Sequence, residues 1–175
     1  MISTNILETP FGEMIAGVRD DVVCLFDFYH RKSIDSIKQR VALHMKDYYL
    51  QEENPIFKEL SAQINAFAQG RLKEFSIPTV FCGTDFQKSV WQHISEIPYG
   101  ETLTYQKLAL KVGDENMVRA VAGATGDNCL AIIVPCHRII GANGSLTGYS
   151  GGVDVKKRLL QLEMANTLPK SGTLF

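Results

Sequence analysis

The sequence predicts an α+β protein, in which a small mixed N-terminal part precedes a mostly helical C-terminal part. β-rich runs alternate with amphipathic helices before residue 80, whereas helical periodicity dominates after it. Hydrophobic residues make up 45% and charged residues 21% of the 175-residue chain, which is typical of a globular protein with a buried core. We therefore expect an N-terminal structural subdomain at residues 1–82 and a second domain at residues 83–175.

The first elements are indicated by β-rich composition and then by helical spacing. Residues 13–18 and 22–28 are β-rich runs separated by three charged residues, which predicts a β-hairpin. A helix follows, because apolar residues recur at helical intervals from Ile34 to Val41.

A second helix has clear start and stop signals. Asn54 is a suitable N-cap, Pro55 fits the first turn, and Gly70 closes the pattern. Its predicted buried face consists of Phe57, Leu60, Ile64 and Phe67. The polar residues of this half form no catalytic pattern, so we interpret residues 1–82 as a scaffold.

The C-terminal part begins with a capping box formed by Thr84 and Gln87. The helix that follows has one apolar face and is ended by Pro98 and Gly100. Its apolar face consists of Phe86, Val90, Ile94 and Ile97.

The next segment has a helix-turn-helix pattern. Thr104 is expected to cap a short helix at residues 105–112, and a turn follows at residues 113–115. Asn116 is expected to cap the second helix.

This second helix has one face made of small side chains beside Arg119. The small residues are Ala120, Gly123 and Ala124, whereas the opposite face contains Val118, Val121, Ala122 and Thr125. Small side chains permit close backbone approach, so the surface suits either a nucleic acid or a closely crossing helix. The residues alone leave both interpretations open.

A reactive pair interrupts an apolar stretch near residue 136. Residues 129–134 are expected to form a buried strand or extended segment, and Cys136 and His137 follow Pro135. Cysteine attacks as a thiolate, so it needs a neighbouring base or positive charge. Adjacent residues of an extended chain point in opposite directions, so contact between the pair needs a turn or a bridging water.

Charge and cysteine usage limit the classes of function. The net charge is −1, but residues 1–85 carry 9 basic and 12 acidic residues, net −3, whereas residues 86–175 carry 9 and 7, net +2. A polyanion should therefore prefer the second half. The four cysteines and four histidines form no zinc-ligand pattern, so we expect neither a metal nor a cofactor. The chain contains no membrane-length apolar stretch and no secretory signal pattern, so we expect a cytoplasmic location without membrane association.

Several motifs in the second half resemble one known family. The combination is similar to the O6-alkylguanine-DNA alkyltransferases, also called methylated-DNA–protein-cysteine methyltransferases, and the first half resembles their bacterial members through TPFGEM. The motifs in the second half are GTDFQKSVWQHISEIPYGETLTYQKLA, VRAVAGA, IIVPCHRIIG, TGYSGG and KKRLLQLE. The resemblance implies a ribonuclease H-like N-terminal subdomain and a C-terminal domain like a winged helix-turn-helix.

The resemblance also implies the chemistry. Cys136 matches the cysteine that accepts the alkyl group from O6-alkylguanine, and from O4-alkylthymine, as a stable thioether, so each molecule acts once. His137, a water and Glu163 match the relay that generates the thiolate. Asn128 matches the residue that braces the active-site turn, and Tyr105 matches the tyrosine that assists the departing base.

The remaining positions concern the substrate and DNA. Tyr149 and Ser150 match the loop that covers the pocket, and backbone carbonyls near Cys136 and Ile139 would read the exocyclic amine of the base. The family binds double-stranded DNA through the minor groove with the damaged base flipped out, and we expect a monomer. The matching DNA-binding positions are Thr104, Arg119, Ala120, Gly123 and Ala124.

Three alternative functions are less well supported. A relative that binds the alkylated base without transfer would lack the cysteine, which is present here as Cys136. A Cys-His hydrolase would need an oxyanion arrangement, which the sequence does not show. A helix-turn-helix regulator would need base-reading polar residues, whereas this helix has one arginine.

Overall fold

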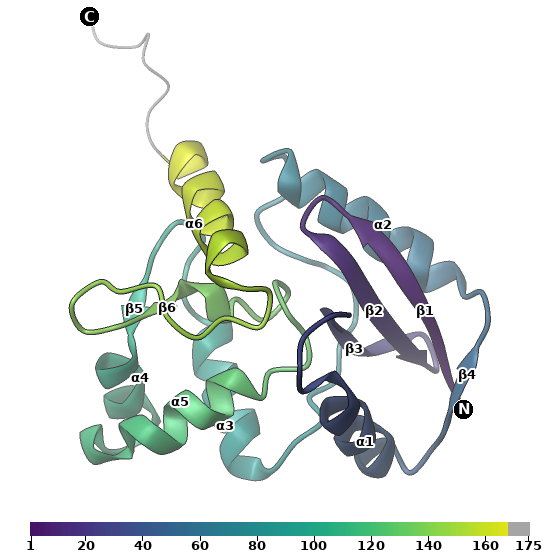
Figure 1. Ribbon diagram of the computed structural model, residues 1–175, viewed down its shortest axis with the longest axis horizontal. Helices are drawn as coiled ribbons and strands as arrows, with labels where there is room; N and C mark the ends of the chain where they lie inside the picture. The colour runs from purple at the N-terminus through teal and green to yellow at the C-terminus, as the bar shows by residue number, and fades with distance from the viewer. Residues whose placement is uncertain (168–175) are drawn as a thin grey trace, which may run out of the picture.

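The computed structural model describes residues 1–167, and its N-terminal part is built on a mixed four-stranded sheet (Figure 1). The sheet order is β3-β2-β1-β4, with β1 antiparallel to β2, β2 antiparallel to β3, and β4 parallel to β1. The strands are β1 (Ile2–Thr9), β2 (Gly12–Arg19), β3 (Val22–Phe28) and β4 (Tyr49–Gln51).

The predicted hairpin is confirmed as β2 and β3. Its two turn residues, Asp20 and Asp21, have φ angles of 49° and 62°. Two successive residues with positive φ match the right-handed twist of the strands, and aspartate tolerates this conformation better than most residues. Strands β1 and β4 are additions that the sequence analysis did not predict.

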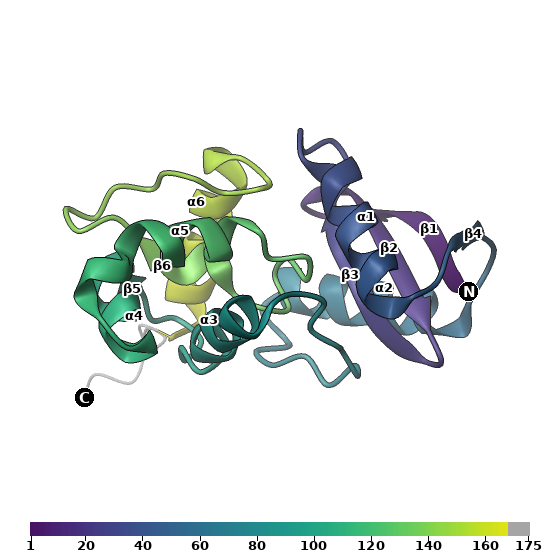
Figure 2. The same cartoon turned by 90° about the horizontal axis from the view of Figure 1, so that it is seen from below.

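The two predicted N-terminal helices are also present. Helix α1 (Ile34–Met45) and helix α2 (Pro55–Ala68) lie on opposite sides of the sheet (Figures 1 and 2). The side chain of Asn54 accepts a hydrogen bond from the backbone N–H of Ile56 at 2.9 Å, which confirms it as the N-cap of α2.

The C-terminal part is mostly helical. The elements are α3 (Asp85–Ser95), β5 (Leu103–Thr104), α4 (Tyr105–Val112), a 3₁₀ turn η1 (Glu115–Met117), α5 (Val118–Gly126), a second 3₁₀ turn η2 (Cys136–Arg138), β6 (Ile139–Ile140) and α6 (Val153–Thr167). The helices surround the short parallel pair β5 and β6 (Figure 1). Within residues 1–167, no helix is both long and apolar enough to span a bilayer.

The helix-turn-helix is confirmed, with one corrected cap. Thr84 and Gln87 form the predicted capping box of α3, and Thr104 accepts from the backbone N–H of Lys107 at 3.2 Å. The Asn116 side chain does not cap α5. Instead, the side chain of Asp114 accepts a hydrogen bond from Asn116 N at 2.8 Å. This bond forms the extra turn η1 before α5 begins.

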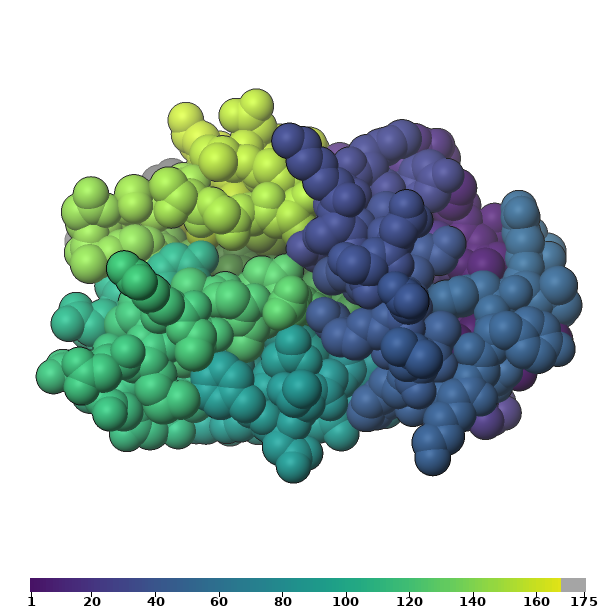
Figure 3. All heavy atoms as spheres, turned by 60° about the horizontal axis from the view of Figure 1, so that its bottom comes forward, coloured from purple at the N-terminus to yellow at the C-terminus, as the bar shows by residue number. Residues whose placement is uncertain are grey.

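The two parts are joined through the edge strand β3. Phe26 donates its backbone N–H to Cys129 O at 2.8 Å, and Ala131 donates to Phe26 O at 2.7 Å. The hydrophobic core runs continuously from the sheet into the helices. Figure 3 shows the two parts in contact along one face of the molecule.

Residues 129–134 are buried except for the partly exposed Ile133, but they do not form the continuous strand that was one of the two predictions. A turn interrupts them, in which Ile132 has a φ of 69° and Val134 N donates to Leu130 O at 2.9 Å. β-branched residues rarely adopt positive φ, so the surrounding contacts must hold this turn. The turn directs the chain into Cys136.

Candidate active site

Cys136 begins the turn η2 and is 7% exposed. Its backbone N–H donates to Val134 O at 2.8 Å, so the turn at residues 131–134 fixes its position. Asn128 donates its side-chain Nδ2 to Cys136 Sγ at 3.2 Å and to Val134 O at 3.1 Å, while Asn128 Oδ1 accepts from Leu130 N at 2.9 Å. One amide therefore holds the turn and contacts the sulfur.

The pKa of the Cys136 thiol is set by opposing effects. Burial raises it, whereas the hydrogen bond from Asn128 lowers it by favouring the thiolate. The charges of Lys156 and Arg31 also lower this pKa, and the charge of Asp27 raises it. Since burial is the largest effect, the thiol needs a base to ionise at neutral pH.

A buried histidine–carboxylate pair stands beside the cysteine. His137 Nε2 lies 2.7 Å from Glu163 Oε1, and the two residues are 0% and 1% exposed. Burial raises the pKa of the Glu163 carboxyl, whereas the hydrogen bonds from His137 and Arg138 lower it. The resulting pKa is about 2. Burial lowers the pKa of His137, although Glu163 opposes this.

The hydrogen bond to Glu163 assigns the tautomer of a neutral imidazole. An ionised carboxylate only accepts hydrogen bonds, so Nε2 of a neutral His137 carries the hydrogen and Nδ1 has a free lone pair. Nδ1 is buried and has no protein partner among the described residues. The histidine can therefore take a proton at Nδ1.

Glu163 is held by more than the histidine. Arg138 donates to it from Nε and Nη2 at 2.8–3.1 Å, and Gly100 donates its backbone N–H to Oε2 at 3.1 Å. Arg138 also donates to Ile97 O at 2.7 Å. These contacts fix the carboxylate so that it orients the imidazole.

The relay does not include a direct bond between the cysteine and the histidine. Within residues 1–167, no hydrogen bond joins Cys136 Sγ to His137, which agrees with the opposite directions expected of neighbouring side chains.

The two predicted tyrosines lie near Cys136. Burial raises the pKa of Tyr105, and the charge of Cys136 raises it further. The Tyr149 hydroxyl is buried without a partner among the described residues. The Tyr149 ring lies edge-on to Phe28, at 5.6 Å between centroids, and to His137, at 6.4 Å.

The other predicted pocket groups differ in whether they are free to contact a substrate. Ser150 is partly exposed beside Tyr149. The carbonyl of Ile139 already accepts from Lys156 Nζ at 2.5 Å, so it keeps one lone pair for another donor. Lys156 is 0% exposed and also donates to Thr147 O at 3.3 Å, so it ties the loop before Tyr149 to the site.

The sequence analysis assigned no role to several of these residues. Arg138 and Lys156 stand inside the motifs that carry the resemblance, and Arg138 lies next to the apolar pair Ile139 and Ile140, whereas Lys156 belongs to the charged run at residues 156–158. The apolar neighbours of Arg138 could have indicated a buried, partnered cation. Phe28, in the N-terminal scaffold, gave no such signal.

The small face of α5 is only partly exposed. Arg119, Ala120 and Gly123 are exposed, whereas Ala124 is 3% exposed and its carbonyl accepts from Trp91 Nε1 at 2.8 Å. The prediction that Ala124 belongs to the outer surface is therefore wrong, because the helix packs that position against α3. Thr104 is half-buried and acts as the N-cap of α4. No cluster of three or more potential metal ligands occurs within residues 1–167.

Known proteins are similar to this chain in sequence. Residues 85–165 match the family described as 6-O-methylguanine DNA methyltransferase, DNA binding domain. A methylated-DNA–protein-cysteine methyltransferase of Methanosarcina acetivorans is 42% identical over 90% of this chain and 96% of its own length. One from Mycobacterium leprae is 50% identical over 70% of this chain and 74% of its own.

Solved structures extend the similarity to the whole fold. The crystal structure of Mycobacterium tuberculosis O6-methylguanine methyltransferase has a TM-score of 0.80 and 35% identity, covering 100% of this chain and 99% of that one. The structure of Mycobacterium tuberculosis OGT in complex with DNA has the same score and identity over 94% of each chain.

Together, the α+β fold, the buried thiol and these matches define a DNA repair methyltransferase. The chain belongs to the methylated-DNA–protein-cysteine methyltransferase family. The expected family, fold class and repair of O6-methylguanine are therefore confirmed.

Proposed function

We propose that Cys136 is the cysteine that accepts the alkyl group, from O6-alkylguanine and from O4-alkylthymine, once per molecule. The observation that carries this proposal is the hydrogen bond from Asn128 to Cys136 Sγ beside the buried His137–Glu163 pair. Cys136 Sγ accepts a hydrogen bond from Asn128, whereas the thiols of Cys24 and Cys82 donate to the backbone carbonyls of Gly17 and Val80, and such a bond exists only while the thiol keeps its proton. These thiols are therefore poor candidates.

The proposed reaction is one displacement. Glu163 holds the Nε2 hydrogen of His137, so Nδ1 takes the proton of Cys136 through a water. The thiolate attacks the alkyl carbon, and the bond from that carbon to O6 of guanine breaks as the sulfur–carbon bond forms. The departing base gains negative charge, and the hydroxyl of Tyr105 stabilises it by donating a hydrogen bond.

The product explains why the protein acts once. A thioether has no good leaving group, and neither water nor a second thiol displaces it. Transfer is therefore stoichiometric and needs no cofactor.

The proposed partner is double-stranded DNA that carries the lesion, as the relative crystallised with DNA suggests. The exposed small face of Ala120 and Gly123 permits close approach to the minor groove, and Arg119 beside it fills the space left by the flipped base. A base cannot react inside the stack, so it must rotate out. Tyr149 and Ser150 would cover the base, and carbonyls near Cys136 and Ile139 would read its amine.

We also propose that residues 83–175 form the DNA-binding and alkyl-acceptor domain and that residues 1–82 form the structural subdomain. Residues 168–175 lie outside the described residues. A single flipped base needs a single pocket, so we propose that the protein acts as a monomer.

Intact-protein mass spectrometry tests the acceptor directly. The protein is mixed with excess duplex containing one O6-methylguanine, and we expect the mass to increase by one methyl group in place of one hydrogen. Peptide mapping should place the methyl on Cys136, and Cys136→Ser should take none. Binding of the duplex without a mass change would instead support a lesion-binding protein that performs no transfer.

A further inference from the structure

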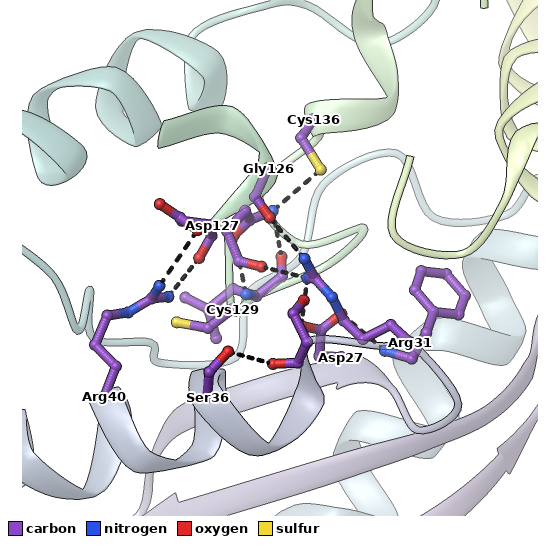
Figure 4. Close-up of polar contacts among 12 residues, drawn as sticks. Asp27, Arg31, Ser36, Arg40, Gly126, Asp127, Cys129 and Cys136 are labelled. Atoms are coloured by element: carbon purple, nitrogen blue, oxygen red, sulfur yellow. Dashed lines mark hydrogen bonds and ion pairs between the residues drawn. The ribbon is translucent and has the colours of Figure 1, made fainter. Parts of the chain in front are cut away.

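An arginine from the N-terminal part contacts the end of α5, next to the active site. Arg31, in the turn before α1, donates from Nη2 to Gly126 O at 2.7 Å and from Nη1 to Asn128 O at 3.3 Å. The same Nη1 donates to Asp27 Oδ2 at 2.8 Å. Figure 4 shows Arg31 and Asp27 reaching towards Gly126, with Cys136 on the far side of this segment.

Charge and hydrogen bonds hold the Arg31 guanidinium in one orientation. The last carbonyls of a helix lack partners within the helix and carry its partial negative charge, so a cation there is favourable. Arg31 is 11% exposed in its side chain and Asp27 is 0% exposed. Asp27 Oδ1 also accepts from Phe28 N at 2.8 Å, so the carboxylate is fixed and holds the guanidinium in one orientation.

Asn128 connects this contact to the nucleophile. Its backbone carbonyl accepts from Arg31, and its side chain donates to Cys136 Sγ. The backbone position of Asn128 sets the direction of its amide, so a shift of this peptide moves the donor away from the sulfur. A hydrogen bond to sulfur favours the thiolate only while the donor stays within reach.

We propose that Arg31 is a positioning residue for the thiolate of Cys136, acting through Asn128. The N-terminal part thereby takes part in activating the nucleophile. The role of Arg31 in repair rests on the proposed function of Cys136 as the acceptor. Like the hydrogen bond from Asn128, the positive charge of Arg31 lowers the pKa of Cys136, because it favours the thiolate over the thiol. The other charged or titratable groups around the sulfur are Asp27, whose charge opposes that of Arg31, and Tyr105, Tyr149, Lys156 and the His137–Glu163 pair.

Arg40 provides a matched control from the same interface. It donates from Nη2 to the carbonyl of Asp127 and from Nε to Cys82 O at 3.1 Å. It therefore joins the two parts one residue away from Asn128, without contacting Asn128 itself. If Arg31 served only to dock the two parts, replacing either arginine would have the same effect on Cys136.

The test measures the pKa of Cys136 in folded protein. Wild type, Arg31→Gln, Arg31→Lys and Arg40→Gln are treated with iodoacetamide over a range of pH, and modified Cys136 is quantified by peptide mass spectrometry. Circular dichroism and thermal unfolding report folding. Methyl transfer is followed separately at saturating duplex containing O6-methylguanine.

We expect Arg31→Gln to raise the pKa of Cys136 by about one unit, which lowers the thiolate fraction and the transfer rate about tenfold at neutral pH. Arg31→Lys should fall between this variant and wild type, because it keeps the charge but loses the forked geometry. Arg40→Gln should keep the pH profile of wild type. Equal profiles for wild type and Arg31→Gln would overturn the proposal, even if the melting temperature fell.

Two further outcomes are also decisive. If Arg31→Gln fails to fold, Arg31→Lys carries the test, and an unchanged Cys136 profile in that variant overturns the proposal. If wild type accepts no methyl from the duplex, the proposed function fails. The iodoacetamide profiles, which need no DNA, still decide whether Arg31 positions the thiolate.

Discussion

Replacing Glu163 by glutamine removes a buried charge that His137 and Arg138 share. The pKa of Glu163 is about 2, compared with its ordinary value of 4.5. The difference of about 2.5 units corresponds to about 3 kcal/mol of folding free energy at neutral pH. Glu163 is 1% exposed, so solvent screens this interaction little, and Arg138 would lose its buried counter-ion. For a chain of this length we expect the melting temperature to fall by about 6–12 °C.

The pH dependence of the stability difference between wild type and Glu163→Gln tests this prediction most directly. A carboxyl whose pKa is lowered by folding stabilises the protein above its unfolded pKa and loses that contribution as pH falls towards its folded pKa. The stability gap between wild type and Glu163→Gln should therefore be full at neutral pH and shrink between pH 4.5 and about 2. Urea unfolding at several pH values measures the gap, with the exposed Glu101→Gln as a control. Equal stability at neutral pH, or a gap that stays constant on acidification, would refute the reasoning.

Two other substitutions test the loop and the DNA surface. In Gly151→Ala the new Cβ would lie 2.5 Å from the ring of Phe28, so either this ring or the loop that carries Tyr149 must shift. We expect a loss of about 1–3 kcal/mol in thermal unfolding together with slower methyl transfer, and an unchanged melting temperature would contradict the packing argument. Arg119→Ala changes an exposed side chain, so we expect normal stability, slower transfer from duplex DNA and unchanged reaction with free O6-benzylguanine. Equal slowing with both substrates would argue against a role in base flipping.

The elements that the sequence predicted correctly depend on neighbouring residues. The hairpin turn at Asp20 and Asp21, the N-cap at Asn54 and the capping box at Thr84 each involve residues within three positions of one another. Asn116 was assigned wrongly because it lies inside the turn η1, which Asp114 caps, and α5 begins after Met117 without a side-chain cap. Local patterns identify that a cap exists better than they identify which residue supplies it.

The features that the sequence could not predict depend on contacts between distant segments. Strand β4 has three residues and pairs with β1, across more than forty positions of chain. Ala124 is buried because α3 packs against it, which the helical spacing of α5 does not reveal. Arg31 and Gly126 are 95 positions apart. The motifs therefore predict the reacting residues that we propose, whereas the contacts around them follow from tertiary packing.

Hydrogen-bond direction, rather than burial, supports Cys136 over Cys24 and Cys82 as the proposed acceptor. All four cysteines are buried, and burial raises the pKa of each of them. Cys24 donates its S–H to Gly17 O at 3.4 Å, and Cys82 donates to Val80 O at 4.0 Å. A bond of this kind exists only while the thiol keeps its proton, so it opposes ionisation.

The sulfur of Cys136 is placed in the opposite role. It accepts a hydrogen bond from the amide of Asn128, and this bond becomes stronger when the sulfur is charged. The buried surroundings that suppress ionisation of Cys24 and Cys129 also keep bulk water from Cys136, so its thiolate is poorly hydrated and correspondingly nucleophilic. In the proposed reaction, the Asn128 donor therefore offsets part of the effect of burial on the Cys136 thiol, and the His137–Glu163 pair supplies the base that ionisation still needs.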